Sequence, residues 1–228
     1  MIVIQSPRAR RALRVAIPGL LMPLLAVSSG ALLAERYYPL LILLCTAASL
    51  ALFAAGFERR KTGARRLALA CVMTALAVVG RFIPFLKPIA AVTILTALAL
   101  GGEAGFLVGA LTALISNFYF GQGPWTPFQM LAFGLIGLAA GALRTSLKKS
   151  RPLLLLYGAL AGAAYSWMMD VWTVLWYDGG FTMALYRAAL LSALPYTVLY
   201  AASNVLFLAV FASSTIRKLD RLVMKYDL

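Results

Sequence analysis

The side chains best placed for chemistry are polar groups set within long apolar runs. Asp170 is the only acidic residue deep in such a run. At the 3.6-residue period of a helix, one polar stripe contains Ser166, Asp170, Thr173 and Tyr177, and a later run carries Tyr196, Tyr200, Asn204 and Phe207. Carboxylate, phenol and amide groups can hold a ligand through hydrogen bonds. We expect Asp170 to contact a ligand rather than only to pair with a neighbouring helix. For the tyrosines and Asn204, hydrogen bonding between helices is an equal alternative.

A segment near the middle of the chain, residues 118–130, concentrates aromatic side chains, helix breakers and amides between two apolar runs. The residues of this segment predicted to contact a ligand are Tyr119, Gln122, Trp125 and Gln129. Asn117, at the end of the preceding run, adds an amide at a similar depth. Thr126 followed by Pro127 is typical of a helix start with Thr126 as the N-cap, so this pair is predicted to be structural.

The chemistry open to these residues is binding rather than catalysis. The sequence contains no His, which excludes His-based acid/base catalysis and His-ligated metal sites. It has no G-x-x-x-x-G-K-[ST] loop for ATP phosphates, and a lone acid is poor material for hydrolysis. Cys45 and Cys71 fall in different apolar runs, so neither a disulfide nor a metal framework is implied. We therefore expect neither an enzyme nor a cofactor.

The elements that position these side chains are membrane helices. The chain has 63% hydrophobic and 12% charged residues and a mean hydropathy of +0.90, so its solvent must be lipid. The apolar stretches are Val15–Ala34, Tyr38–Phe57, Leu67–Phe82, Ile89–Leu100, Gly105–Phe118, Pro127–Leu143, Leu153–Trp176 and Leu190–Ala212. Because they lack the alternation of a barrel strand, each is predicted to be a helix. The first is longer than a signal-peptide core and lacks a clear cleavage site, so we expect it to be retained.

The cations predict how these helices are oriented. Most of the 21 Lys and Arg residues fall in segments 8–14, 59–66, 144–151 and 217–225. The others, Arg36, Arg81, Lys87 and Arg187, fall in connections on the opposite side. The positive-inside rule then predicts that both termini are cytoplasmic. The net charge of +14 reflects this topology, and no nucleic-acid binding is expected because no basic cluster is interleaved with aromatics on a soluble domain.

Composition changes once along the chain, at a basic connection. We predict an all-α integral membrane protein organised as a two-helix N-terminal hairpin (1–57), a basic cytoplasmic linker (58–66), a six-helix membrane domain (67–216) and a basic cytoplasmic tail (217–228). The connections predicted to face outward, Gly80–Pro88, Tyr119–Thr126 and Tyr177–Ala189, carry aromatics, Pro and Gly. A ligand is therefore expected to be met from outside.

Small residues recur at four-residue spacing on several of the predicted helices. They include Gly101, Gly105, Gly109 and Ala113, the pairs Gly137/Gly141 and Gly158/Gly162, and on the first core helix Ala64/Ala68 and Cys71/Ala75. Such spacing lets helix backbones approach closely. Internal packing explains most of this pattern, and a smooth face could also dock another membrane protein.

Three strings carry a resemblance to a known family: Gly-Phe-Leu-Val-Gly-Ala at 105–110, Ser-Asn-Phe at 116–118 and Phe-Gly-Gln-Gly-Pro-Trp-Thr-Pro-Phe-Gln-Met at 120–130. With the hydropathy and loop pattern over about two-thirds of the chain, they resemble the substrate-specific S component of an energy-coupling factor (ECF) type ABC vitamin importer. The two N-terminal helices depart from the minimal pattern of that family.

The resemblance implies a six-helix S-component bundle in a bacterial cytoplasmic membrane, with its pocket near the outer face beneath the three outward connections. It implies a transmembrane coupling (T) subunit and two cytosolic ATPase subunits as partners. It also implies that the partner docks on small residues of the first core helix, here Ala64, Ala68, Cys71 and Ala75. The branch carrying the 120–130 string is linked to corrinoid uptake, so cobalamin is the leading candidate substrate.

The function expected from the sequence is therefore capture of a vitamin or related micronutrient for ATP-driven uptake by partner subunits. Two alternatives remain open. One is a stand-alone proton-coupled transporter that uses Asp170 as a relay, although the two halves of the chain are not obvious repeats. The other is a structural or assembly membrane protein without a ligand.

Overall fold

Helices form nearly all of the structure. A computed structural model describes residues 6–31, 37–56, 60–84, 86–177 and 180–226, apart from the side chains of 30, 31, 60–62 and 177, and these ranges contain no β-strand. Six helical stretches in the described ranges are long and apolar enough to cross a membrane: Pro7–Ser29, Tyr38–Ala55, Gly63–Arg81, Gly102–Phe120, Arg151–Trp176 and Leu194–Tyr226. The prediction of an all-α integral membrane protein is confirmed.

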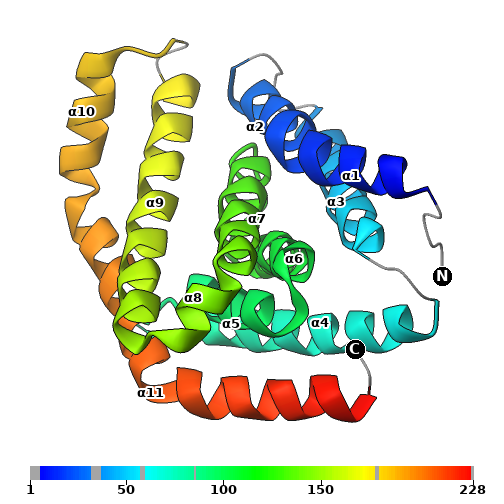
Figure 1. Cartoon of the computed structure of the whole chain (residues 1–228). Helices are drawn as coiled ribbons and strands as arrows, with labels where there is room; N and C mark the ends of the chain where they lie inside the picture. The colour runs from blue at the N-terminus through cyan, green and yellow to red at the C-terminus, as the bar shows by residue number, and fades with distance from the viewer. Residues whose placement is uncertain (1–5, 32–36, 57–59, 85, 178–179, 227–228) are drawn as a thin grey trace.

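The elements follow one another along the chain in the order shown in Figure 1. They are α1 (Pro7–Ala16), η1 (Ile17–Leu21), α2 (Met22–Ala31), α3 (Tyr38–Ala55), α4 (Arg60–Arg81), α5 (Ile89–Leu100), α6 (Gly102–Phe120), α7 (Thr126–Ala142), α8 (Arg144–Lys149), α9 (Arg151–Tyr177), α10 (Met183–Ser192) and α11 (Leu194–Tyr226). The element η1 is a short π-helical turn at Pro18, where proline lacks the N–H that a regular helix would use.

The first helix begins before the apolar run that predicted it. Ser6 caps α1 by accepting a hydrogen bond of 3.3 Å from the backbone N–H of Ala9, and Pro7 occupies the first helical position. The four arginines of segment 8–14 are therefore part of this helix rather than an extension ahead of it. The capping sequence, rather than the start of the apolar run, determines where the helix begins.

Helix α5 forms the centre of the bundle. Every residue from Ile89 to Leu100 is buried, and α5 packs against α4, α6, α7 and α11. At 12 residues it is shorter than the stretches that qualify as membrane spans. Because it is surrounded by protein rather than lipid, its ends do not have to reach both faces of a bilayer of about 30 Å.

A glycine seam joins α6 to α7. A Cβ atom added at Gly105 would lie 3.0 Å from the carbonyl oxygen of Gly137, and one added at Gly109 would overlap the backbone of Phe133. On the other side of the bundle, a Cβ at Gly162 of α9 would lie 2.6 Å from the backbone nitrogen of Ala201 in α11. Internal packing therefore accounts for the glycine pattern of α6, α7 and α9.

The N-terminal hairpin lies against the bundle. Helix α2 packs on α7, and α3 packs on α6. Figure 1 shows the hairpin in blue beside the green α6 and α7, with the C-terminal half of α11 running next to α4. Arg65 of α4 donates a 3.1 Å hydrogen bond to the carbonyl oxygen of Tyr226 at the end of α11.

The last predicted connection contains a helix. Residues 177–189 were expected to form a loop, but α10 begins at Met183, where the side chain of Thr182 accepts a 3.3 Å hydrogen bond from the N–H of Leu185. The helix is interrupted at Ala193, before Pro195, and α11 then extends to Tyr226. The basic segment 217–225 is therefore helical throughout.

Candidate functional site

A buried hydrogen-bond network centres on Asn117, near the end of α6. The Asn117 side chain is 1% exposed. Its Nδ2 donates to Thr126 Oγ1 at 2.9 Å and to Gln129 Oε1 at 2.8 Å. Its Oδ1 accepts a hydrogen bond of 2.7 Å from Arg81 Nη1. Because both donors and the acceptor of the amide are engaged, its orientation is fixed by α4, α6 and α7 together.

The network continues across the bundle through Gln129 and Tyr165. Gln129 Nε2 donates to the Tyr165 hydroxyl of α9 at 3.2 Å. The Tyr165 ring stacks on Phe133 with ring centroids 4.2 Å apart, and it meets Tyr200 of α11 edge-on at 5.0 Å. Two predicted site residues far apart in sequence, Gln129 and Tyr200, thus lie on either side of Tyr165.

Arg81, the last residue of α4, provides the charged end of the network. In addition to Asn117, its Nη1 donates to Ser116 Oγ at 2.5 Å. The guanidinium lies over the Phe120 ring, 4.6 Å from its centroid. Arg81, Ser116 and Tyr165 were not among the site residues predicted from the sequence. For Arg81 a signal existed, since it is one of the few cations outside the basic segments.

The connection between α6 and α7 is held by Gln122. Its Nε2 donates to the carbonyl oxygen of Leu114 at 2.8 Å, and its Oε1 accepts from Thr126 Oγ1 at 3.0 Å. The prediction that Thr126 is the N-cap is wrong. Thr126 is the first residue of α7, Trp125 precedes it, and no side chain caps the helix. The Thr126 hydroxyl is engaged instead with the amides of Asn117 and Gln122, which leaves it unavailable as a cap.

Trp125 folds back over its own connection. Gly121 adopts a positive φ of 103°, and a Cβ at Gly123 would overlap the Trp125 ring, so both positions favour glycine. The indole meets Trp172 of α9 edge-on at 5.9 Å, and Trp172 in turn stacks on Trp176 at 5.8 Å. Trp125 is thereby placed beside the C-terminal part of α9.

Asp170 of α9 is buried, with 7% of its surface exposed. Its Oδ2 has no hydrogen-bond partner among the described residues. Ser166, one turn earlier, is satisfied by Thr197 of α11 at 2.7 Å. The predicted stripe therefore does face the bundle interior at these two positions, but only Ser166 is paired there.

The remaining predicted contacts lie elsewhere. Tyr119 is 73% exposed and packs against Phe82, with ring centroids 4.7 Å apart. Tyr196 is 62% exposed on α11. Asn204 is 1% exposed, and its Oδ1 accepts a 3.2 Å hydrogen bond from the N–H of Ala91 in α5, which ties two helices together. The side chain of Tyr177 falls outside the described residues.

The four residues predicted to dock a partner are all exposed. Ala64, Ala68, Cys71 and Ala75 lie on one face of α4. A groove of about 300 Å³ between α4 and the end of α11 includes Ala68, and a groove of about 290 Å³ between α4 and α6 includes Cys71 and Ala75. Of the small-residue patterns in the sequence, this one is free of internal packing.

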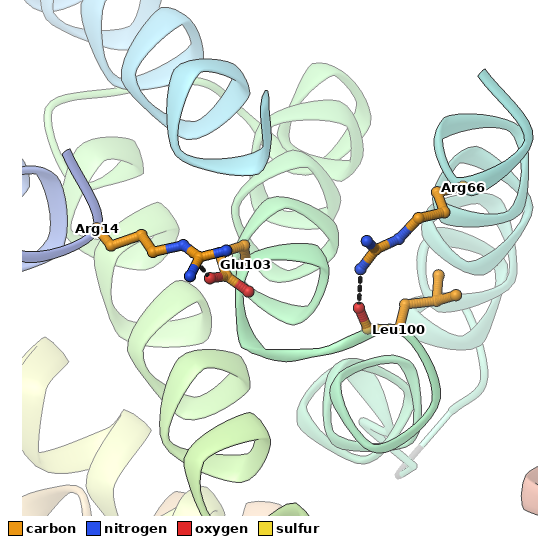
Figure 2. A network of polar contacts seen from close by, with 4 residues as sticks. All are labelled: Arg14, Arg66, Leu100 and Glu103. Atoms are coloured by element: carbon orange, nitrogen blue, oxygen red, sulfur yellow. Dashed lines mark hydrogen bonds and ion pairs between the residues drawn. The ribbon is translucent and has the colours of Figure 1, made fainter. Parts of the chain in front are cut away.

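A second polar network lies at the other end of α4 and α6, as Figure 2 shows. Arg14 of α1 forms an ion pair of 2.8 Å with Glu103 in the first turn of α6. Arg66 of α4 donates to the carbonyl oxygen of Leu100, where α5 ends at Gly101 with a positive φ of 96°. The N-terminal hairpin is thus connected to the bundle through a charge at the α5–α6 turn (Figure 2).

The network around Asn117 contains groups suited to non-covalent binding. Amides, hydroxyls and a guanidinium can orient a small molecule, whereas no group of three or more His, Cys, Asp or Glu side chains in the described part of the chain could hold a metal ion. A multi-pass helical membrane protein with such a network has groups suited to holding a small molecule by non-covalent contacts.

The family follows from comparison with models of protein families. Residues 65–219 match the family described as ECF transporter, substrate-specific component, and the chain belongs to this family. No curated protein and no solved structure matched. The protein is therefore a multi-pass substrate-binding membrane subunit of an ECF importer in the cell membrane, which works with T and ATPase subunits and is not an enzyme.

Proposed function

We propose that this chain captures a vitamin or related micronutrient outside a bacterial cell and releases it inward when its partner subunits hydrolyse ATP. Membership of the S-component family supports this role in uptake, and the buried network around Asn117 supports the position of the ligand site. Buried side-chain polar groups within a membrane protein are costly. The network ends in the cation of Arg81 beside an exposed aromatic cluster, and these groups can receive a polar ligand.

The ligand site comprises the network and the groups around it. From the residues predicted by sequence we retain Asn117, Tyr119, Gln122, Trp125, Gln129, Asp170, Tyr177, Tyr196, Tyr200 and Asn204 as candidates. Asn117 and Gln129 have the strongest support because they bond to each other. Tyr200 follows, since it contacts the same Tyr165 ring. Cobalamin is the first substrate to test, on the basis of the 120–130 string.

We further propose that both termini are cytoplasmic. The basic segments are joined at one end of the bundle: Arg14 pairs with Glu103, Arg65 bonds to Tyr226, and Lys148 pairs with Asp220 at 2.7 Å. Arg81 lies at the opposite end of α4. By the positive-inside rule, the Arg81 end faces outward.

Binding can be tested with the purified protein. Native mass spectrometry identifies any ligand that copurifies, and titration with cobalamin, riboflavin and thiamin measures saturable binding. Asn117→Ala should abolish the binding because it removes three hydrogen bonds from the network. Thr74→Ala is the control, since the Thr74 hydroxyl is also buried but bonds only to Ala70 of its own helix. Folded protein that retains no ligand and binds no micronutrient would refute the proposal.

The exposed small-residue face of α4 is proposed to dock the T subunit. A bulky side chain there would hold the two helix backbones apart. Ala68→Trp should prevent copurification with the T and ATPase subunits while ligand binding stays unchanged. Ala202→Trp is the matched control, because Ala202 is an exposed alanine on α11. Equal copurification of both variants would place the docking face elsewhere.

A further inference from the structure

The charge on Arg81 has no counter-charge among the residues that the structure describes. The ion pairs among described residues are Arg14–Glu103 and Lys148–Asp220, and both lie away from Arg81. The hydrogen bonds of Arg81 go to neutral acceptors, Asn117 Oδ1 and Ser116 Oγ. An arginine within a membrane-spanning helix is costly unless something compensates its charge.

The geometry of the guanidinium leaves one edge available. Both hydrogen bonds to side chains leave from Nη1, which has two N–H groups. Nε and Nη2 make no hydrogen bond with any described residue, and neither is buried without a partner. This is the edge at which arginine binds a carboxylate or phosphate with two parallel hydrogen bonds. The plane of the group is fixed by Phe120 on one face and by Asn117 and Ser116 at Nη1.

Lys87 brings a second positive charge to the same place. Its Nζ donates to the carbonyl oxygen of Arg81 at 3.2 Å and lies 5.9 Å from the centroid of the Phe120 ring. No described carboxylate pairs with it. Two cations beside one ring repel each other, and a bound anion would convert that repulsion into attraction.

From these contacts we infer that the substrate of this protein carries an anionic group, a carboxylate or a phosphate, which binds the Nε–Nη2 edge of Arg81 with Lys87 close by. The inference rests on the proposed function, because it assigns the substrate class of the same site. Asn117 holds the guanidinium of Arg81 in place, and Gln129 and Tyr165 continue the network toward the neutral part of the substrate.

Matched ligand pairs test the inference in detergent. The pairs differ only in the anion: biotin and biotinamide, pantothenate and pantothenol, riboflavin and its 5′-phosphate, pyridoxal and its 5′-phosphate. For at least one pair, the anionic member should bind on the order of 10- to 100-fold more tightly, because charge-assisted hydrogen bonds of this kind contribute that much. Arg81→Gln should remove the preference, and Arg81→Lys should restore it only in part, because lysine lacks the planar edge.

The control variant is Arg187→Gln, which removes an exposed arginine of α10 on the side of the membrane where Arg81 is predicted to lie. It should leave the preference unchanged. If Arg81→Gln does not fold, the comparison of Arg81→Lys with the wild type still measures the contribution of the planar edge.

The outcomes separate the inference from the function on which it rests. Tight binding of a neutral ligand that Arg81→Gln leaves unchanged would overturn the anionic substrate and preserve the proposed function. No binding of any panel member, with no copurifying ligand, would overturn both. An anionic lipid is the other source of the same chemistry, so the titrations are repeated in nanodiscs with and without phosphatidylglycerol. If phosphatidylglycerol is the only anion whose binding depends on Arg81, the inference is overturned.

Discussion

The two ends of α4 place an arginine in different surroundings. Near the start of the helix, Arg66 lies in a corner where Glu103 is paired with Arg14 (Figure 2). At the end of the helix, the guanidinium of Arg81 contacts amide, hydroxyl and aromatic groups, and the nearby charge of Lys87 has the same sign. The 15 positions between these arginines correspond to roughly 22 Å of helix rise. One end has an acid among its arginines, and at the other end no described carboxylate pairs with Arg81.

This difference predicts different sensitivities to mutation. An exposed or half-exposed ion pair stabilises a protein by about 0–1 kcal/mol. A buried amide network is more demanding, because each polar group left unpaired costs about 1–3 kcal/mol. Changes at the Glu103 end should therefore alter stability slightly, and changes at the Arg81 end should alter ligand affinity.

The largest effect is expected in the glycine seam between α6 and α7. Gly137→Ala places a Cβ against the backbone of Gly105, which cannot rotate away as a side chain would. Overpacking of this kind costs about 1–3 kcal/mol and occasionally more. We expect a large fall in melting temperature and loss of ligand binding, measured by thermal unfolding and titration.

Gly19→Ala is the control for the seam, because a Cβ at Gly19 meets nothing within 4 Å. Alanine is the better helix former, so Gly19→Ala should be neutral or slightly stabilising. If the two variants melt at the same temperature, α6 and α7 do not approach as closely as the structure indicates.

The sequence predicted the helices well because their pattern is local. Apolar runs of spanning length define helices wherever lipid surrounds them. The amides Asn117 and Gln129 could be chosen because they flank one connection, and they do bond to each other. The spacing of the small residues on α4 could be seen in the sequence, but their exposure is known only from the structure.

What the sequence could not predict depends on contacts between distant segments. Tyr165 joins the network because α9 packs beside α7, which no local pattern indicates. The same holds for the glycines of α6, whose partner Gly137 had to be seen before packing could be distinguished from docking. Thr126 had the pattern of a cap, but two neighbouring amides compete for its hydroxyl.

Asp170, like Arg81, has no counter-charge among the described residues. Its substitution tests whether both groups belong to one binding site. Asp170 lies five positions beyond Tyr165 along α9, and its Oδ2 lacks a partner among the described residues. Asp170→Asn keeps the shape of the side chain and removes its charge. If a donor on the ligand completes this carboxylate, affinity should fall by on the order of 10-fold, as for loss of a charged hydrogen bond.

The rival interpretation of Asp170 makes a different prediction. A proton relay would support uptake into liposomes driven by a pH gradient with no ATPase subunit present, and Asp170→Asn would stop that uptake. We expect no such uptake from the wild-type protein. Observing it would replace the binding role of Asp170 by proton coupling.

A smaller effect is expected at the Tyr165 end of the network. Tyr165→Phe removes only the hydroxyl that accepts from Gln129, and the ring can still stack on Phe133. Loss of one neutral hydrogen bond should weaken ligand binding by roughly 5- to 10-fold. Tyr157→Phe is the matched control on the same helix, because its hydroxyl donates to the carbonyl oxygen of Ile136, away from the network. Equal affinities of the two variants would restrict the site to the Arg81 side.

The smallest effect is expected at the Glu103 end. Glu103→Gln removes the charge that pairs with Arg14, and Arg14→Gln removes its partner. Because Arg14 is 44% exposed, solvent screens the pair, and a double-mutant cycle on thermal stability should give a coupling of about 1 kcal/mol or less. Ligand affinity should not change in either variant, since the ion pair and Asn117 lie at opposite ends of α6. A loss of affinity in Glu103→Gln as large as in Asp170→Asn would mean that the two ends are coupled. The hairpin attached through Arg14 would then take part in substrate binding.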